Sequence, residues 1–170
     1  MYFDNAKAPL PSVCIEIPDG INGIRETLKV MQRFAVEGSR SGQVRQLAQE
    51  LTLPDLQKDW MGEVRRVHEF VRDRIRYVKD PVDVEAVQTP QATLDLKSGD
   101  CDDKATLTAA LLKAIGHPSR FVAVAFKPGQ LSHVYVETKI GNRWIPLELT
   151  EPWITGTAPP GAVGRMIKNV

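Results

Sequence analysis

The chain has 170 residues, of which 42% are hydrophobic, and its 22 basic and 21 acidic residues leave a formal net charge of +1. This length suits one domain with a sizeable core rather than two. The balanced charge argues against a nucleic-acid-binding protein, which would carry a basic excess or a basic stripe.

The N-terminus and the cysteines indicate where the protein is expected to work. No run approaches the roughly 20 apolar residues that span a membrane, and the first residues lack the basic and apolar segments of a secretory signal. The two cysteines, Cys14 and Cys101, make no disulfide framework, although the sequence allows a single bond between them. We therefore expect a cytoplasmic protein with neither a nucleic-acid nor a membrane partner.

The first part of the predicted single domain, 1–170, is an arm followed by helices. Residues 1–20 are interrupted by prolines, which predicts an extended arm with one short strand at 13–17. Apolar residues recur at helical spacing over 21–37 and 43–51. These helices make up an expected N-terminal helical region, 21–58.

The expected core, 59–150, begins with a third helix. Asp59 is a suitable N-cap, and the apolar stripe continues to about Tyr77. The segment 79–98 holds several breakers and is predicted to be a loop with a short helix at 90–96.

A fourth long helix is the best-defined element of the sequence. Asp100 caps it and Gly116 closes it. The hydrophobic period then changes from about 3.6 to 2, which predicts strands at 120–126, 132–139 and 143–149. Helices first and strands later favour an α+β fold, with an irregular tail at 151–170.

Cys101 follows the cap of this helix. In the first turn the N–H groups and the helix dipole would stabilise a thiolate, the form in which cysteine is a nucleophile, and could also donate to an oxyanion. The neighbouring aspartates oppose the thiolate, so a cationic partner is needed. Taken alone, Cys101 is better explained as a small buried cysteine.

The cationic partner of Cys101 is expected on a hairpin. If Gly141-Asn142 is a two-residue turn, Ile140 faces Arg143 and His133 faces Thr150, so that His133 becomes a diagonal neighbour of Glu148 at roughly 7–8 Å. In this register His133, Tyr135, Glu137, Glu148 and Thr150 share one face, and a one-residue slip would separate the histidine from the carboxylate. A base beside an orienting acid is what a thiol nucleophile needs, and the combination favours a catalytic site.

The other histidines are given structural roles. His68 lies on the apolar stripe of its helix and is expected in the core or at its boundary, whereas His117 follows a C-capping glycine and is expected to be exposed. Cys14 has no histidine or cysteine at zinc spacing, and there is no phosphate-binding loop. We therefore predict neither a metal nor a cofactor.

Several segments resemble the core of the transglutaminase-like superfamily. They are GDCDD at 99–103, LLKAIGHPSR at 111–120, SHVYVE at 132–137 and RWIPLE at 143–148, with the helix at 67–78 and QTP at 88–90 before them. The resemblance covers about 60–150.

The resemblance implies a papain-like α+β fold with the central helix packed on an antiparallel sheet. It implies Cys101 as nucleophile, His133 as general base and Glu148 as orienting acid, where the family usually has aspartate. Oxyanion or substrate contacts are assigned to Gln88, Gln91, Asp102 and Tyr135.

The family includes several activities, so the reaction stays open. We expect a cysteine peptidase or amide hydrolase that acts on a peptide or protein amide, with water as the default acceptor. A protein cross-linking acyltransferase is one alternative. A structural or assembly protein, for example of a phage particle, is the other, and it would use the N-terminal arm or the C-terminal tail to bind its partner.

Overall fold

The computed structural model describes residues 12–14, 20–53, 58–80 and 86–170. The helices in these ranges are α1 (Ile21–Gly38), α2 (Gly42–Thr52), α3 (Trp60–Arg74), α4 (Pro90–Leu96) and α5 (Cys101–Ala114). The strands are β1 (Ser12–Cys14), β2 (Arg76–Tyr77), β3 (Ala86–Gln88), β4 (Ser98–Gly99), β5 (Ser119–Lys127), β6 (Gln130–Ile140), β7 (Arg143–Leu147) and β8 (Gly164–Asn169).

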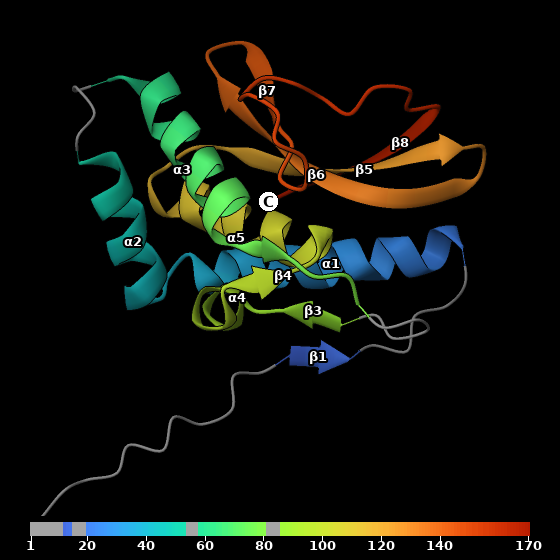
Figure 1. Ribbon diagram of the computed structural model, residues 1–170, viewed down its shortest axis with the longest axis horizontal. Coiled ribbons are helices and arrows are strands. Elements are labelled where there is room, and N and C mark those ends of the chain that lie inside the picture. The colour runs from blue at the N-terminus through green and yellow to red at the C-terminus, as the bar shows by residue number, and fades with distance from the viewer. Residues whose placement is uncertain (1–11, 15–19, 54–57, 81–85) are drawn as a thin grey trace, which may run out of the picture.

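A four-stranded antiparallel sheet and the central helix α5 form the core. The strand order is β7-β6-β5-β8, and α5 lies between this sheet and α1 (Figure 1). Every residue of α5 from Asp103 to Leu112 is buried, as expected of a helix covered on all sides. The papain-like α+β fold is thus confirmed. None of the described helices is both long and apolar enough to cross a membrane.

The start of α5 is fixed by its own aspartates. Asp100 Oδ1 accepts from the amides of Asp102 (2.9 Å) and Asp103 (3.2 Å), and Asp103 Oδ2 accepts in return from the Asp100 amide (3.2 Å). This reciprocal capping box satisfies amides that have no partner within the helix. Gly116, at φ 88°, follows the C-terminal end as predicted.

The β6–β7 hairpin has the predicted register. Ile140 pairs with Arg143, and the ladder continues to Val136 and Leu147. It ends there, so the predicted pairing of His133 with Thr150 is not part of it. The amide of Thr150 donates to the Glu148 carboxylate instead of continuing the strand.

The third helix is shorter than predicted. It ends at Arg74, and the next residues form β2, which pairs in parallel with β4. Lys104 of α5, only 2% exposed, donates from Nζ to the carbonyl oxygens of Arg72 (3.2 Å) and Ile75 (2.8 Å). The lysine therefore satisfies carbonyls that the end of α3 leaves without helical partners. Burial lowers the pKa of Lys104 to about 8.

The C-terminal tail is not irregular throughout. Residues 164–169 form β8, which pairs with β5 from Ala125 to Arg120, so this part of the prediction was wrong. The strand lies at the edge of the sheet, and all of its residues are exposed or partly exposed. The alternation of hydrophobic and polar residues in β8 is weak, so the sequence did not indicate a strand. The strand forms through its pairing with β5 rather than through burial of its side chains.

Two further expectations concern His117 and the N-terminal arm. His117 was expected to be exposed, but it is buried at 8% exposure. Its Nε2 lies 2.6 Å from Glu63 Oε2 of α3. The pairing of α3 with the end of α5 was not visible in local sequence. In the arm, Ser12–Cys14 pairs with β3, and the rest of the predicted strand lies outside the described residues.

Gly38 tests the packing between α1 and α4. A Cβ at Gly38 would lie 2.5 Å from Pro90 Cγ, whereas a Cβ at Gly42 would meet nothing within 4 Å. We expect Gly38→Ala to lower the free energy of unfolding by about 1–3 kcal/mol through overpacking. Gly42→Ala, the matched control, should lose nothing in the same urea titration. Equal midpoints for the two variants would contradict the close contact.

Candidate active site

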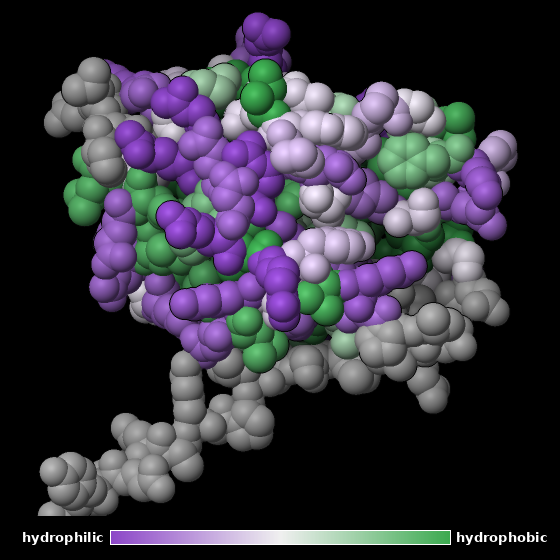
Figure 2. All heavy atoms as spheres, in the orientation of Figure 1, coloured by the Kyte–Doolittle hydropathy of each residue, from purple (hydrophilic) through white to green (hydrophobic). Residues whose placement is uncertain are grey.

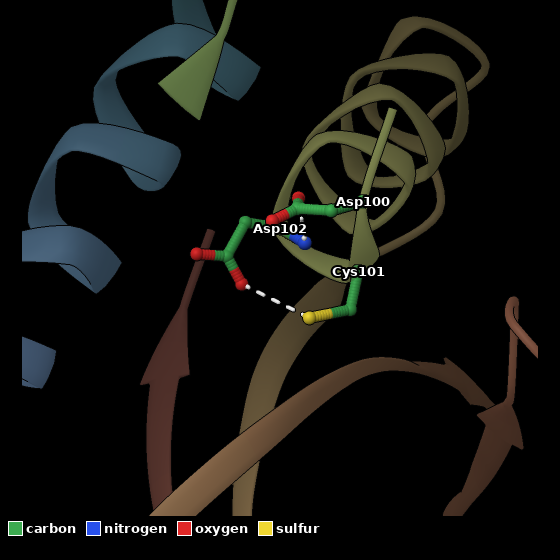
Figure 3. Close-up of side chains that lie close together, drawn as sticks. All are labelled: Asp100, Cys101 and Asp102. Carbon is green, nitrogen blue, oxygen red and sulfur yellow. Dashed lines mark hydrogen bonds between the residues drawn. The ribbon is translucent and has the colours of Figure 1, made fainter. Parts of the chain in front are cut away.

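Cys101 is the first residue of α5, and its sulfur has two hydrogen-bond partners. Its Sγ lies 3.5 Å from Asp102 Oδ1, and Figure 3 shows the two side chains leaving the start of the helix toward each other. The backbone amide of Val134 on β6 also donates to this sulfur. The thiol therefore lies against β6, beside Val134, which directly follows His133.

The early end of β7 makes room for this contact. Its last paired residue, Leu147, faces Val136, so β7 does not reach the Val134 amide two residues further along β6. In a longer ladder such an amide would have a backbone partner. Here the edge of β6 is open, and the sulfur of Cys101 takes the place of that partner.

His133 and Glu148 form a direct pair beside the same edge. The Nε2 atom of His133 lies 2.8 Å from Glu148 Oε2, and the Glu148 carboxylate is buried at 1% exposure. The ring of Phe126 stacks against the imidazole with centroids 6.4 Å apart. Since Nε2 is engaged by the carboxylate, Nδ1 is the nitrogen available to exchange a proton with a thiol.

The carboxylate of Glu148 is held by its own turn as well as by His133. Its Oε1 accepts from the amides of Leu149 (3.0 Å) and Thr150 (2.9 Å) and from Thr150 Oγ1 (2.7 Å). Burial alone would raise the pKa of this carboxyl, but the bonds from His133 and Thr150 lower it overall. Glu148 is thus a buried carboxylate beside an imidazole, the arrangement that fixes a histidine tautomer.

The surroundings of the thiol favour its protonated form. Burial, Asp102 and Asp100 together raise the pKa of Cys101 well above its usual value, and only the Val134 amide opposes them. No hydrogen bond joins Cys101 to the His133 ring in the described part of the chain. Asp100 also takes two of the first-turn amides that the sequence offered to an oxyanion, those of Asp102 and Asp103.

Of the remaining predicted site residues, two have contacts at the start of α5 and two lie in other elements. Asp102 contacts the thiol. The backbone amide of Gln88 donates to Asp103 Oδ1 (2.7 Å) at the start of the same helix. Tyr135 is buried and donates from its hydroxyl to Glu137 Oε1 (3.1 Å), so its side chain supports the sheet rather than the thiol. Gln91 is half-buried in the first turn of α4.

Two residues near the thiol were not singled out from the sequence. Asp103 is fully buried, and it joins the α5 cap to β3 by accepting from the backbone amide of Gln88. Burial together with the charge of Asp100 raises the pKa of Asp103 to about 7. The D-x-x-D spacing with Asp100 is the signal that could have shown it. Tyr77 on β2 pairs with Gly99, and burial together with the charge of Asp100 raises its pKa.

A metal site at the helix start would draw on the same residues. Asp100, Cys101 and Asp102 each offer one ligand atom, and these atoms lie within 4.8 Å of one another. Hydrogen bonds already engage the sulfur and both aspartates.

Asp102 tests the electrostatics of the thiol. Because its charge disfavours the thiolate, Asp102→Asn should lower the pKa of Cys101. The rate of alkylation by iodoacetamide at pH 7 should then rise by up to about tenfold for each pH unit by which that pKa falls. Alkylation rates measured from pH 5 to 10 follow the change in pKa directly. Glu26→Gln on the exposed surface of α1 removes one charge as a control, and equal profiles for the two variants would contradict the role of Asp102.

Comparisons with known proteins identify the family and the fold. The family model of the transglutaminase-like superfamily matches residues 45–149, more than half of the chain. A search of curated protein sequences finds no match.

Several solved structures share the fold, among them the following three. A candidate cysteine protease from Cytophaga hutchinsonii is 19% identical with a TM-score of 0.55, over 82% of this chain and 51% of its own. A candidate protease from Parabacteroides distasonis is 15% identical with a TM-score of 0.60, over 84% and 36%. Legionella pneumophila LapG is 20% identical with a TM-score of 0.53, over 82% and 78%. This chain thus spans about half of the first protein and about a third of the second, and it belongs to the transglutaminase-like superfamily.

Proposed function

We propose that the chain is a cysteine-dependent peptidase or amide hydrolase, with Cys101 as nucleophile, His133 as general base and Glu148 as the acid that orients it. One observation carries this proposal. The thiol and the His133–Glu148 pair lie at the same open edge of β6, although the cysteine and the carboxylate come from segments far apart in sequence. The likeness to candidate proteases supports the same reaction class.

In the first step the Cys101 thiol gives its proton to Nδ1 of His133, and the sulfur bonds to the carbonyl carbon of the substrate amide. The C=O electron pair moves to the oxygen. When that pair returns, the C–N bond breaks, and the imidazolium gives the proton to the leaving amine. The Glu148 carboxylate stabilises the imidazolium while it carries the proton.

In the second step water resolves the thioester. His133 takes a proton from the water as its oxygen bonds to the acyl carbon. The C–S bond then breaks, and the imidazolium returns the proton to the sulfur, which releases the acid and restores the thiol. For the first step to begin, the thiol must exchange its bond to Asp102 for one to His133. The raised pKa of Cys101 makes the ion pair with the imidazolium the route to a thiolate.

The alternatives use the same residues or the chain ends. A cross-linking acyltransferase would form the same thioester and differ only in an amine acceptor. An assembly protein would need an arm or tail that binds a partner, but residues 164–169 already pair with β5. On the face shown in Figure 2 hydrophilic side chains predominate and hydrophobic ones form small groups.

Removal of the nucleophile is the direct test. Cys101→Ala should abolish hydrolysis of fluorescein-labelled casein and covalent labelling by iodoacetamide at neutral pH, because it removes the attacking sulfur. Cys14→Ala is the matched control and should keep both. Labelling that persists in Cys101→Ala through Cys14 alone, with hydrolysis intact, would overturn the assignment.

The acid of the site is tested by two substitutions. Glu148→Gln keeps the size of the side chain but loses the charge that stabilises the imidazolium, so we expect turnover to fall by about 10²–10⁴-fold. Glu148→Asp keeps the charge one methylene further back and should give an intermediate rate. Circular dichroism and thermal unfolding check that both variants fold; unchanged turnover in Glu148→Gln would exclude Glu148 from the site.

A further inference from the structure

We propose that His68 is a positioning residue for Glu148: its Nε2–H holds the Glu148 peptide carbonyl and so places the carboxylate against His133. This inference rests on the proposed function, because it assigns a support to the acid of the same site. His68 was expected in the core or at its boundary, and its contacts give it this more specific role.

The contacts of His68 lead directly to the end of β7. The side chain lies on α3, is fully buried, and brings Nε2 to 2.6 Å from the carbonyl oxygen of Glu148. Its other nitrogen, Nδ1, lies 2.8 Å from Thr155 Oγ1. Both bonds cross from the helix to the segment that follows Leu147.

The tautomer of His68 follows from these partners. A carbonyl oxygen only accepts, so Nε2 carries a proton and donates it to Glu148. Burial lowers the pKa of His68, which keeps the ring neutral and leaves Nδ1 as an acceptor for the Thr155 hydroxyl. Each polar atom of the ring therefore has one role, and the ring orientation is fixed at both ends.

Glu148 needs such a support because the sheet no longer provides one. The ladder between β6 and β7 ends at Leu147, so no strand pairing holds the next residue. Its carbonyl is buried with the rest of the residue, and a buried carbonyl without a donor is costly. His68 supplies this donor and fixes the peptide plane from which the carboxylate extends to His133.

The same face of α3 has a second donor one turn later. Arg72 Nη1 donates to the Trp153 carbonyl oxygen at 2.7 Å. Positions 68 and 72 are neighbours on one helix face, so the two side chains together hold the segment 148–153. Of the two, only His68 contacts Glu148, and this separates the positioning role from general anchoring of the segment.

Two substitutions of His68 separate its bonds. The amide nitrogen of glutamine lies where Nε2 lies in histidine, so His68→Gln keeps a donor for Glu148. The polar end of asparagine corresponds to Nδ1, so His68→Asn keeps a partner for Thr155 and loses the bond to Glu148. His117→Asn, which disturbs the other buried histidine and its bond to Glu63, controls for loss of stability alone.

The experiment measures iodoacetamide alkylation of Cys101 from pH 5 to 10 in the full chain, with Cys14→Ala in every variant so that one thiol remains. We expect His68→Asn to slow alkylation at pH 6 by about tenfold, which moves the profile by about one pH unit to higher pH. His68→Gln and His117→Asn should keep the original profile. The Nε2–H proton resonance of His133 should move or broaden only in His68→Asn.

The outcomes distinguish the positioning role from the proposed site. A profile for His68→Asn that equals that of the parent, or an equal displacement in His68→Gln, overturns the positioning role. A displacement in His117→Asn as large as that in His68→Asn, at similar thermal stability, attributes the effect to stability and also overturns it. If Glu148→Gln leaves the same profile unchanged, the proposed site itself fails.

Discussion

The structure of the site depends on the point at which β7 stops. Glu148 Oε1 binds the amides of Leu149 and Thr150, and a continuing strand would offer the first of these to β6. The strand therefore ends at Leu147, and the edge of β6 near Val134 stays open. The sulfur of Cys101 binds there, and the other oxygen of Glu148 reaches His133. One carboxylate thus ends a strand and binds the His133 imidazole.

The length of the glutamate side chain suits this double role. One oxygen is committed to the turn of the chain and the other to the imidazole, so both acceptor positions have partners. His68 then satisfies the peptide carbonyl that the turn leaves without a strand partner.

The start of α5 combines two opposing electrostatic requirements. Asp100 and Asp103 stabilise the helix start through the capping box, and the positive end of the helix dipole favours carboxylates there. The same charges, with Asp102 and burial, disfavour the thiolate of Cys101. The aspartates at the helix start therefore stabilise the fold at the expense of the thiolate. The imidazolium of His133 is the cation that the proposed chemistry requires.

The sequence by itself determined the elements whose signals are local. Asp100 and Gly116 delimit α5, the Gly141-Asn142 turn sets the hairpin register, and both follow from capping and turn chemistry within a few residues. That register was sufficient to place His133 near Glu148. Only the tertiary structure decided the rest: β8 exists because β5 offers it a partner, α3 ends where Lys104 reaches its carbonyls, and His68 meets Glu148 across 80 residues. Such long-range contacts leave no periodic pattern in the chain, because each depends on a partner that folding alone brings into reach.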